Sequence, residues 1–438
     1  MKLDLTIPSL GPCHVDSPLK LSKQKGISTF NYSDDTQKIL YDTSLKNFEA
    51  CLAKGEAPLA FEKAGPREKI YFDPSKTKAA IVTCGGLCPG INNVIRGLVM
   101  GLYYRYGVNN TIGIKYGYEG FIPSFGHPFV ELTPRNVADI HKSGGTILGS
   151  SRGKQNVSEV VDTLDRHNIN ILFAIGGDGT LRGVQAIVEE IERRGLKIAV
   201  AGIPKTIDND INFIEKSFGF ETAFTTANPI IRDAHNEAKG AYNGIAIVKL
   251  MGRDSGFIAV NAALSMPDVN FVIIPEMDFE LEGENGLLAA IQRRLAKTKH
   301  ALVVVAEGAG QFLFNNELGT DASGNIKYHD IGIFLKDKIV EHFKKQNMPA
   351  TVKYIDPSYI IRSAPANASD SVFCGKLALN AVHGAMAGKT GFVVGRWNNQ
   401  FIHLPIPVAV KERMKIDLQG ELWWNVLEAT GQPMEMKS

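Results

Sequence analysis

The stretches GIPKTIDND, residues 202–210, and IGGDGT, residues 175–180, decide how this chain can fold. Each stands at the end of an apolar run and continues into a turn that carries aspartate, threonine or lysine. Nearly continuous apolar runs of this length are typical of strands buried on both faces of a parallel sheet. The polar residues that follow would then lie at the carboxyl ends of strands, where open α/β sheets bind ligands.

The same pattern recurs along the chain and predicts an α/β fold. Short apolar runs predict strands at residues 78–84, 111–116, 169–175, 197–203, 244–250, 270–275 and 300–308. Helical periodicity falls between them at residues 92–104, 157–166, 181–194, 223–237 and 286–297. Strands that alternate with helices indicate right-handed βαβ units. We therefore expect two doubly wound, mostly parallel sheets with the active site in the cleft between them.

Changes in composition along the chain predict its domains. The first 75 residues are proline-rich and weakly periodic, which predicts an N-terminal extension. We expect a first domain at residues 76–220, with a return of the chain at about residues 365–400. A second domain would cover residues 221–364, and residues 401–438 would form a C-terminal segment.

Bulk composition excludes several classes of protein. With 438 residues, 44% hydrophobic content and a formal net charge of +2, the chain is an ordinary globular sequence with little attraction for nucleic acid or an anionic membrane. No apolar run approaches the roughly 20 residues of a membrane span, and the N-terminus does not resemble a signal peptide. We expect a cytoplasmic protein. Five scattered cysteines predict neither a disulfide framework nor a zinc site.

Two glycine turns are suited to phosphate. In GGLCPGINNVIRG, residues 85–97, the amides of a first helical turn could bind a phosphate, or the glycines could simply make a tight turn. In GGDGT, a carboxylate among such amides suggests that Asp178 is a Mg²⁺ ligand; alternatively it caps a helix that begins at Leu181.

The segment PKTIDND, residues 204–210, carries the most reactive groups. In extended backbone Thr206 and Asp208 would point to one side. Asp208 could accept a hydroxyl proton, Thr206 could hold a phosphate or the reacting hydroxyl, and Asp210 could serve a metal or orient Arg253. The plainer alternative is an Asx-rich loop after a strand. Such a set of groups is what phosphoryl transfer needs, since that reaction depends on positioning and charge neutralisation.

Further candidates follow other predicted strands. Arg253 in LMGRDSG could bind phosphoryl oxygens or pair with Asp254. Glu307 could bind sugar hydroxyls or cap a turn. Three cations and one phenol could bind a phosphate monoester or a nucleotide phosphate: Arg152, Lys353, Arg362 and Tyr359.

With these motifs in this order, over about residues 78–395, the chain resembles the 6-phosphofructokinases. The DPSY-x-IR form and the N-terminal extension are similar to the plant-type and trypanosomatid ATP-dependent branch, which is close to the pyrophosphate-dependent enzymes. The resemblance implies Mg²⁺-dependent transfer from ATP to fructose 6-phosphate, the committing step of glycolysis, in a homodimer or homotetramer.

The resemblance also assigns residues by position. Those implied to contact ATP are Gly86, Arg152, Gly153, Gly177, Asp178, Gly179 and Thr180, with Asp178 and Asp210 as candidates for the metal. Those implied to contact the sugar phosphate are Thr206, Ile207, Asp208, Met251, Gly252, Arg253, Glu307, Lys353, Tyr359 and Arg362. Asp208 would be the proton acceptor, and Arg253 would stabilise the transferring phosphoryl group.

The choice of phosphoryl donor depends on two residues. Pyrophosphate users resembling this chain carry aspartate at the position of Gly179, where a carboxylate would repel the α-phosphate of ATP. Gly179 therefore favours ATP. Lys205 argues the other way, because many ATP users have glycine there, but the plant-type branch combines the two as here.

The chain also departs from many bacterial members of the family. They have arginine where this chain has Gly244, histidine for Tyr359 and arginine for Lys353. These differences argue against binding of the sugar 6-phosphate by residues of a neighbouring subunit. The alternatives are a pyrophosphate-dependent enzyme, another GGDGT kinase acting on NAD or a diacylglycerol, and a non-catalytic regulatory subunit.

Overall fold

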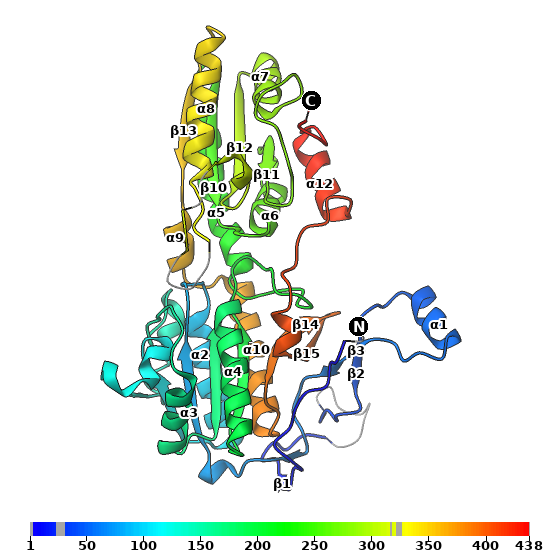
Figure 1. Cartoon of the computed structure of the whole chain (residues 1–438), viewed down its shortest axis with the longest axis vertical. Helices are drawn as coiled ribbons and strands as arrows, with labels where there is room; N and C mark the ends of the chain where they lie inside the picture. The colour runs from blue at the N-terminus through cyan, green and yellow to red at the C-terminus, as the bar shows by residue number, and fades with distance from the viewer. Residues whose placement is uncertain (1–2, 23–30, 316–317, 321–325, 438) are drawn as a thin grey trace. The chain divides into compact units, whose positions relative to one another are not determined.

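The computed structural model describes residues 3–22, 31–315, 318–320 and 326–437, which form two compact α/β units (Figure 1). The first unit consists of Met1–Thr206, Ile211–Gly219 and Pro365–Glu412, and the second consists of Ile207–Asp210, Phe220–Ala364 and Arg413–Ser438. The α/β fold class is confirmed.

A nine-stranded sheet forms the centre of the first unit. Its strand order is β2-β3-β15-β14-β9-β8-β5-β6-β7. The five central strands are parallel: β14 (Phe392–Trp397), β9 (Ala199–Pro204), β8 (Ile171–Gly176), β5 (Lys78–Thr83) and β6 (Asn110–Ile114). The edges are antiparallel: β2 (Lys38–Leu40), β3 (Ala60–Lys63) and β15 (Gln400–Pro405) at one end, β7 (Val130–Glu131) at the other. The sheet is parallel where the βαβ pattern predicts it and antiparallel elsewhere.

Two pairs of helices cover this sheet. Every residue of β8 and β9 is buried, as continuous apolar runs predict for central parallel strands. Helix α3 (Val157–Arg166) packs against α4 (Asp178–Arg193), and α2 (Ile91–Met100) packs against α10 (Ala368–Met386). The helix predicted at residues 92–104 ends earlier, at Met100, and continues as a π-helical turn, Gly101–Tyr106.

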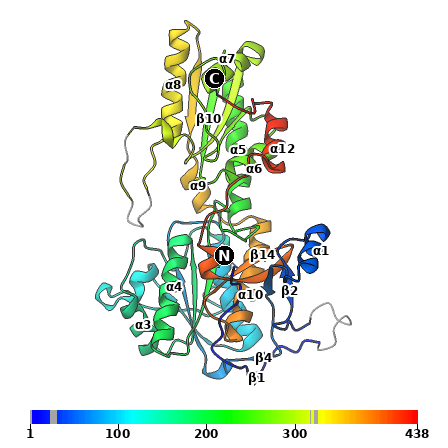
Figure 2. The same ribbon diagram turned by 45° about the vertical axis from the view of Figure 1, so that its right-hand side comes forward.

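A four-stranded parallel sheet forms the centre of the second unit, in the order β11-β12-β10-β13. The strands are β10 (Gly244–Leu250), β11 (Phe271–Ile273), β12 (His300–Ala306) and β13 (Thr351–Ile355). The helices are α5 (Phe220–Lys239), α6 (Phe257–Ser265), α7 (Leu287–Thr298), α8 (Ile331–Lys345), α9 (Ser358–Ser363) and α12 (Glu421–Thr430). Helix α8 packs on β10 and β13, and α12 packs on α6 and β11 on the other side of the sheet (Figure 2).

The chain ends differ from the expected segments. Within the N-terminal extension, β3 pairs with β15 and β2 pairs with β3, so both strands belong to the large sheet. Helix α1 (Leu45–Ala53) connects β2 to β3 in the sequence. Residues 401–438 do not form one segment: β15 belongs to the first unit because it pairs with β14, whereas α12 belongs to the second, where Trp423 and Val426 are buried. Shorter elements are β1 (Val15–Asp16), β4 (Lys69–Ile70), α11 (Ile406–Ala409) and the 3₁₀ helices Pro74–Lys76, Gly117–Phe121, Pro123–Phe125, Ile140–Lys142 and Gln311–Leu313.

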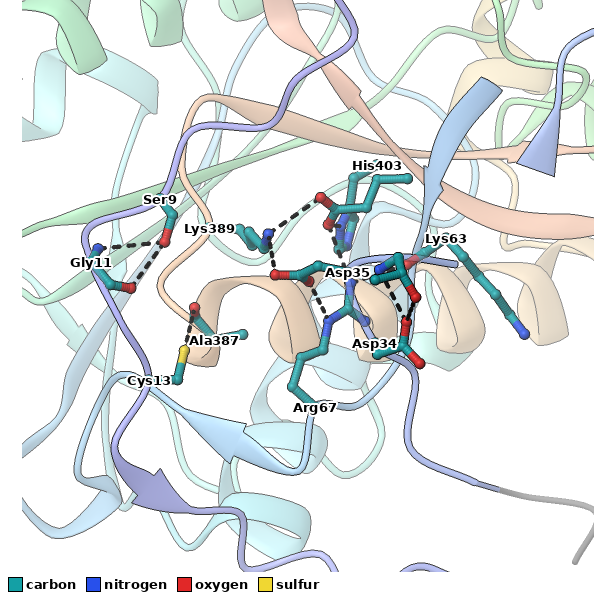
Figure 3. A network of polar contacts seen from close by, with 12 residues as sticks. Ser9, Gly11, Cys13, Asp34, Asp35, Lys63, Arg67, Ala387, Lys389 and His403 are labelled. Carbon is teal, nitrogen blue, oxygen red and sulfur yellow. Dashed lines mark hydrogen bonds and ion pairs between the residues drawn. The ribbon is translucent and has the colours of Figure 1, made fainter. Parts of the chain in front are cut away.

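A buried ion network fastens the extension to the large sheet (Figure 3). Glu62 of β3 accepts hydrogen bonds from His403 of β15 (2.8 Å), Lys389 (3.2 Å) and Arg67 (3.2 Å). Asp35 bridges the same Arg67 and Lys389 at 2.9 and 3.1 Å. Burial raises the pKa of Glu62, but the hydrogen bond from His403 and the surrounding positive charges outweigh burial and lower it. The carboxylate is therefore held ionised.

Removal of the Glu62 charge should destabilise the first unit in a pH-dependent way. Glu62→Gln leaves Lys389 and Arg67 without a buried partner and should cost about 3 kcal/mol near pH 7. Because the pKa of Glu62 is lowered in the folded state, its contribution is present above the unfolded value of about 4.3 and is lost as the pH falls through the folded value. Urea unfolding measured from pH 7 to pH 3 should show that the difference in free energy of unfolding between wild type and variant disappears as the pH falls. An exposed control, Glu56→Gln, should show no gap; a pH-independent deficit in Glu62→Gln would contradict this assignment.

Candidate active site

Three adjacent strands of the first unit end in the loops that the sequence singles out. Strands β5, β8 and β9 are neighbours, so the loops after them meet at one edge of the sheet. The backbone N–H of Lys205, after β9, donates to the carbonyl of Gly176 at 2.9 Å. Its Nζ atom donates to the carbonyl of Gly86, after β5, at 2.8 Å. The buried Lys205 thus links the loop after β9 to the two glycine turns after β5 and β8.

A fourth loop brings Arg152 to the same edge. The carbonyl of Ser151 accepts from the N–H of Gly85 at 3.1 Å, and Ser150 Oγ donates to the Gly85 carbonyl at 2.5 Å. A Cβ atom added to Gly86 would lie 3.6 Å from the Arg152 guanidinium. The exposed Arg152 and the left-handed Gly153 (φ 108°) therefore flank the first glycine turn, which makes this edge attractive to an anion.

The GGDGT motif forms the first turn of α4. The helix begins at Asp178, with Gly177 at its N-cap, so the alternative that Asp178 caps a helix starting at Leu181 is wrong. The Asp178 carboxylate lies 3.3 Å from Arg182 Nε, and the carbonyl of Thr180 accepts from the Tyr118 hydroxyl at 2.8 Å. Free amides of a first helical turn and the helix dipole favour a phosphate at this point.

In the second unit, acidic residues and one arginine form a cluster. Arg413 contacts Asp254 and lies 3.4 Å from Asp210 Oδ2. The Tyr328 hydroxyl donates to the second Asp254 oxygen at 2.9 Å. The backbone of Asp208 joins this cluster, since its carbonyl accepts from Ser255 Oγ at 3.5 Å.

Asp208 is a carboxyl group of this cluster with a strongly raised pKa. Burial is the largest cause, followed by the charges of Asp210 and Glu307, and together they raise the pKa of Asp208 to about 8; Arg362 and Arg413 oppose them. The residue keeps some exposed surface, but its Oδ1 atom is buried. A carboxyl group that titrates near neutral pH in a site of this kind is a candidate general base.

Glu307 is a second carboxyl group with a raised pKa. Burial raises it, while Arg362, Lys249 and Arg253 act in the opposite direction. Its N–H donates to the carbonyl of Leu250 at 2.9 Å, which places Glu307 beside the loop that follows β10. Arg362 influences both Asp208 and Glu307, so the structure brings these three predicted residues together.

The backbone between Thr206 and Asp210 is not extended. Ile207 and Asp208 lie in a turn, and Asn209 takes a left-handed conformation (φ 56°), which asparagine tolerates better than most residues. The expectation that Thr206 and Asp208 alternate along one side of an extended strand is therefore wrong. The Thr206 carbonyl accepts from Ser217 Oγ at 2.5 Å in the first unit, and the buried Ile207 begins the second.

The MGR loop is built around a glycine. Gly252 has φ 133°, and a Cβ atom there would lie 2.6 Å from the Ser255 carbonyl, so only glycine fits. Met251 before it is fully buried. Arg253 stacks on the Tyr328 ring at 4.6 Å and donates to the Ile326 carbonyl. The predicted alternative, a pair with Asp254, is not formed, because Asp254 contacts Tyr328 and Arg413 instead.

Two predicted phosphate-binding residues lie outside the acidic cluster. Tyr359 on α9 is 83% exposed, whereas Ile361 on the same helix is buried. Lys353 of β13 is also exposed. Arg362, one turn after Tyr359, is the member of this group whose charge reaches Asp208.

Sequence reasoning missed two cations. Arg413 follows Asp210 by 203 positions, and nothing in its own neighbourhood marks it. Lys249 forms ion pairs with Asp330 (2.6 Å) and Asp356 (3.0 Å). A lysine inside the apolar run GIAIVKL was a usable signal, because a buried lysine needs a partner.

Comparisons with known proteins show which family the chain resembles. The family profile described as Phosphofructokinase matches residues 78–385. The chain is 52% identical to an ATP-dependent 6-phosphofructokinase of Borreliella burgdorferi over 100% of this chain and 98% of that protein. It is 49% identical to ATP-dependent 6-phosphofructokinase 1 of Arabidopsis thaliana over 86% of this chain and 80% of that protein.

Solved structures resemble the fold at lower identity. A pyrophosphate-dependent phosphofructokinase from Marinobacter aquaeolei superposes with a TM-score of 0.67 and 18% identity, covering 81% of this chain and 91% of that chain. A phosphofructokinase from Saccharomyces cerevisiae gives a TM-score of 0.61 and 20% identity, covering 81% and 47%. At these identities the likeness is one of fold alone.

Removal of the Asp210 charge should lower the pKa of Asp208. Asp210→Asn keeps the side-chain shape but removes a negative charge. Of the charges of Asp210 and Glu307, that of Asp210 raises the pKa of Asp208 more. The protonation midpoint of Asp208, followed by isotope-edited infrared spectroscopy and assigned with Asp208→Asn, should move from about 8 towards the ordinary range. Asp233→Asn, an exposed change on α5, is the control. An unchanged midpoint in Asp210→Asn would mean that the charge of Asp210 does not act on Asp208.

Proposed function

The chain belongs to the phosphofructokinase family, and from that premise we propose how its residues divide the transfer of the terminal phosphoryl group of ATP to the 1-hydroxyl of fructose 6-phosphate. The products are ADP and fructose 1,6-bisphosphate. The observation that carries the residue assignment is Asp208, a carboxyl group with a raised pKa among Asp210, Glu307 and Arg362.

The glycine turns of the first unit would bind ATP. Amides at the start of α4 and the nearby Arg152 offer donors to phosphate oxygens, and the Lys205 ammonium lies among the same turns. At Gly179 a Cβ atom would meet nothing within 4 Å, so the position opens onto free space. That space is where a nucleotide α-phosphate could lie, and it supports ATP as donor over pyrophosphate.

Asp208 would accept the proton of the sugar 1-hydroxyl. A general base works best when its pKa lies near the operating pH, because it is then both deprotonated and basic enough to attract the proton. Glu307 would hold sugar hydroxyls, and Thr206 would position the reacting hydroxyl. Met251 and Gly252 would line the sugar site, and Ile207 would support the turn that presents Asp208.

Arginines would neutralise the charge of the phosphoryl groups. Arg253 would stabilise the group in transfer, since a guanidinium can donate two parallel hydrogen bonds to its oxygens. Arg362 would bind the 6-phosphate, with Tyr359 and Lys353 as further contacts. The exposure of Tyr359 and Lys353 leaves both side chains accessible to a ligand.

Mg²⁺ is the metal cofactor that we propose. In this kind of site it would neutralise charge on the phosphates of the nucleotide. Asp178 fits such a role, because its carboxylate stands in the first turn of α4 with 30% of the side chain exposed. Asp210 is the second candidate; its side chain is 7% exposed and faces Arg413.

Assembly and location complete the proposal. We propose a homodimer or homotetramer, as the family resemblance implies, and a cytoplasmic location. Within the ranges that the structure describes, no helix is long and apolar enough to cross a membrane.

Two alternatives have specific support. Lys205 is the residue that pyrophosphate users carry, so a pyrophosphate-dependent enzyme is the second candidate. A regulatory subunit that binds sugar phosphate without turnover is the third, and the presence of Asp208, Arg253 and Asp178 argues against it.

Asp208→Asn should separate catalysis from binding. The variant keeps shape and loses the proton acceptor, so turnover should fall by about 10²–10⁴-fold. Fructose 6-phosphate affinity, measured by calorimetry, should stay within a few fold. Asp233→Asn should keep full turnover. Near-normal turnover in Asp208→Asn would overturn its role as base.

Gly179→Asp should test the donor assignment against a matched control. Gly179→Ala adds a methyl group without a charge and should lower ATP activity far less than the aspartate does. Gly179→Asp adds a carboxylate there, and kcat/KM for ATP should fall roughly 100-fold or more, because juxtaposed like charges cost several kcal/mol. The measurement is kcat/KM for ATP of both variants, determined by steady-state kinetics. ATP activity that survives the aspartate would refute the argument from Gly179.

A further inference from the structure

Two histidines of the second unit face each other away from the acidic cluster. His235 lies near the end of α5, and His300 is the first residue of β12. Their Nε2 atoms are 3.2 Å apart, and the rings are tilted by 43° with centroids 5.1 Å apart.

The other nitrogen of each ring is held by an oxygen that can only accept. His235 Nδ1 lies 3.2 Å from Asp268 Oδ1, and His300 Nδ1 lies 2.9 Å from the carbonyl oxygen of Thr298. A carboxylate and a carbonyl have no proton to donate, so both Nδ1 atoms carry the hydrogen. In a neutral imidazole the Nε2 atom is then the acceptor. Two neutral rings in this arrangement direct two lone pairs at each other, which is unfavourable unless a metal ion or a shared proton lies between the two Nε2 atoms.

The dimensions of the gap suit a transition metal. Zn–N bonds of about 2.0–2.1 Å at a tetrahedral angle set two ligand nitrogens roughly 3.3 Å apart. Histidines that bind metals usually donate their other N–H to a carboxylate or a backbone carbonyl, which fixes the tautomer. Asp268 and Thr298 occupy those two places.

We propose that His235 and His300 form a binding site for one divalent transition-metal ion of the Zn²⁺, Ni²⁺ and Cu²⁺ group, through their Nε2 atoms. Imidazole is a ligand that these ions prefer. Among the described residues no group of three or more His, Cys, Asp or Glu side chains completes a metal site, so water fills the remaining positions. The Asp268 side chain is 48% exposed, which puts the pair near solvent.

The surroundings indicate an exchangeable metal. Burial, the largest influence on the pKa of His235, lowers it against the charge of Asp268, and His300, Lys239 and Arg294 also lower it. The same positive charges reduce the affinity for a cation. With two protein ligands instead of the four of closed structural sites, the ion would bind with moderate strength.

The site lies far from the residues assigned to catalysis along the same strand. Strand β12 runs for seven residues from His300 to Ala306, and Glu307 follows it. At about 3.3 Å per residue this separates His300 from Glu307 by roughly 23 Å. The metal would therefore join α5 to the start of β12 and stabilise the second unit, with no part in phosphoryl transfer.

Zinc binding to the full chain, freed of metal by a chelator and without nucleotide, tests this proposal. Calorimetry should detect one Zn²⁺ site per chain, and Zn²⁺ should raise the thermal unfolding temperature by about 2 °C or more. His300→Gln and His235→Gln should each weaken binding at least roughly tenfold and abolish the thermal shift. The control is His342→Gln, because His342 is a part-buried histidine on α8 that contacts Gln292 at 3.0 Å.

Two further readouts separate a metal site from a purely structural role. Cu²⁺ bound to the wild type should give an electron paramagnetic resonance spectrum with coupling to two nitrogens, and each variant should lose it while keeping phosphoryl-transfer activity. If Zn²⁺ binds the wild type and both variants equally, or does not stabilise the wild type at all, the proposal is wrong and the two rings share a proton instead.

Discussion

Parallel strands buried on both faces place the chemistry of this chain. Such strands have no room for polar side chains, so polar groups collect in the loops at their carboxyl ends. In the first unit this constraint gathers the turns after β5, β8 and β9, which Lys205 links. In the second it sets Glu307, after β12, beside the loop that follows β10. The sheets supply rigidity, and the loops carry function.

Two buried carboxyl groups show how the fold uses electrostatics in opposite ways. Glu62 is surrounded by His403, Lys389 and Arg67, so its pKa is lowered and its charge holds the extension in place. At Asp208 burial raises the pKa, and the charges of Asp210 and Glu307 raise it further. The first arrangement serves stability. The second arrangement brings three carboxyl groups close together, as active sites often do to shift a pKa.

The sequence predicted β5, β6, β8 and β9 of the large sheet and β10, β11 and β12 of the small one, because long-range packing and local pattern agree there. It did not indicate β2 and β3, because these strands are only three and four residues long and contain no continuous apolar run. It also missed Arg413, whose partners Asp210 and Asp254 are distant in the chain. The turn at Asn209 was mistaken for extended backbone because the alternation of Thr206 and Asp208 resembles a strand. These failures concern long-range pairing and single backbone conformations, which a local pattern does not encode.

The most direct test is the formation of fructose 1,6-bisphosphate from fructose 6-phosphate by the unmodified chain with Mg²⁺, with ATP and pyrophosphate supplied in parallel. The account predicts turnover with ATP and none above background with pyrophosphate. Turnover with pyrophosphate would contradict the donor assignment while keeping the sugar site. An absence of product with either donor would contradict the catalytic role of the acidic cluster altogether.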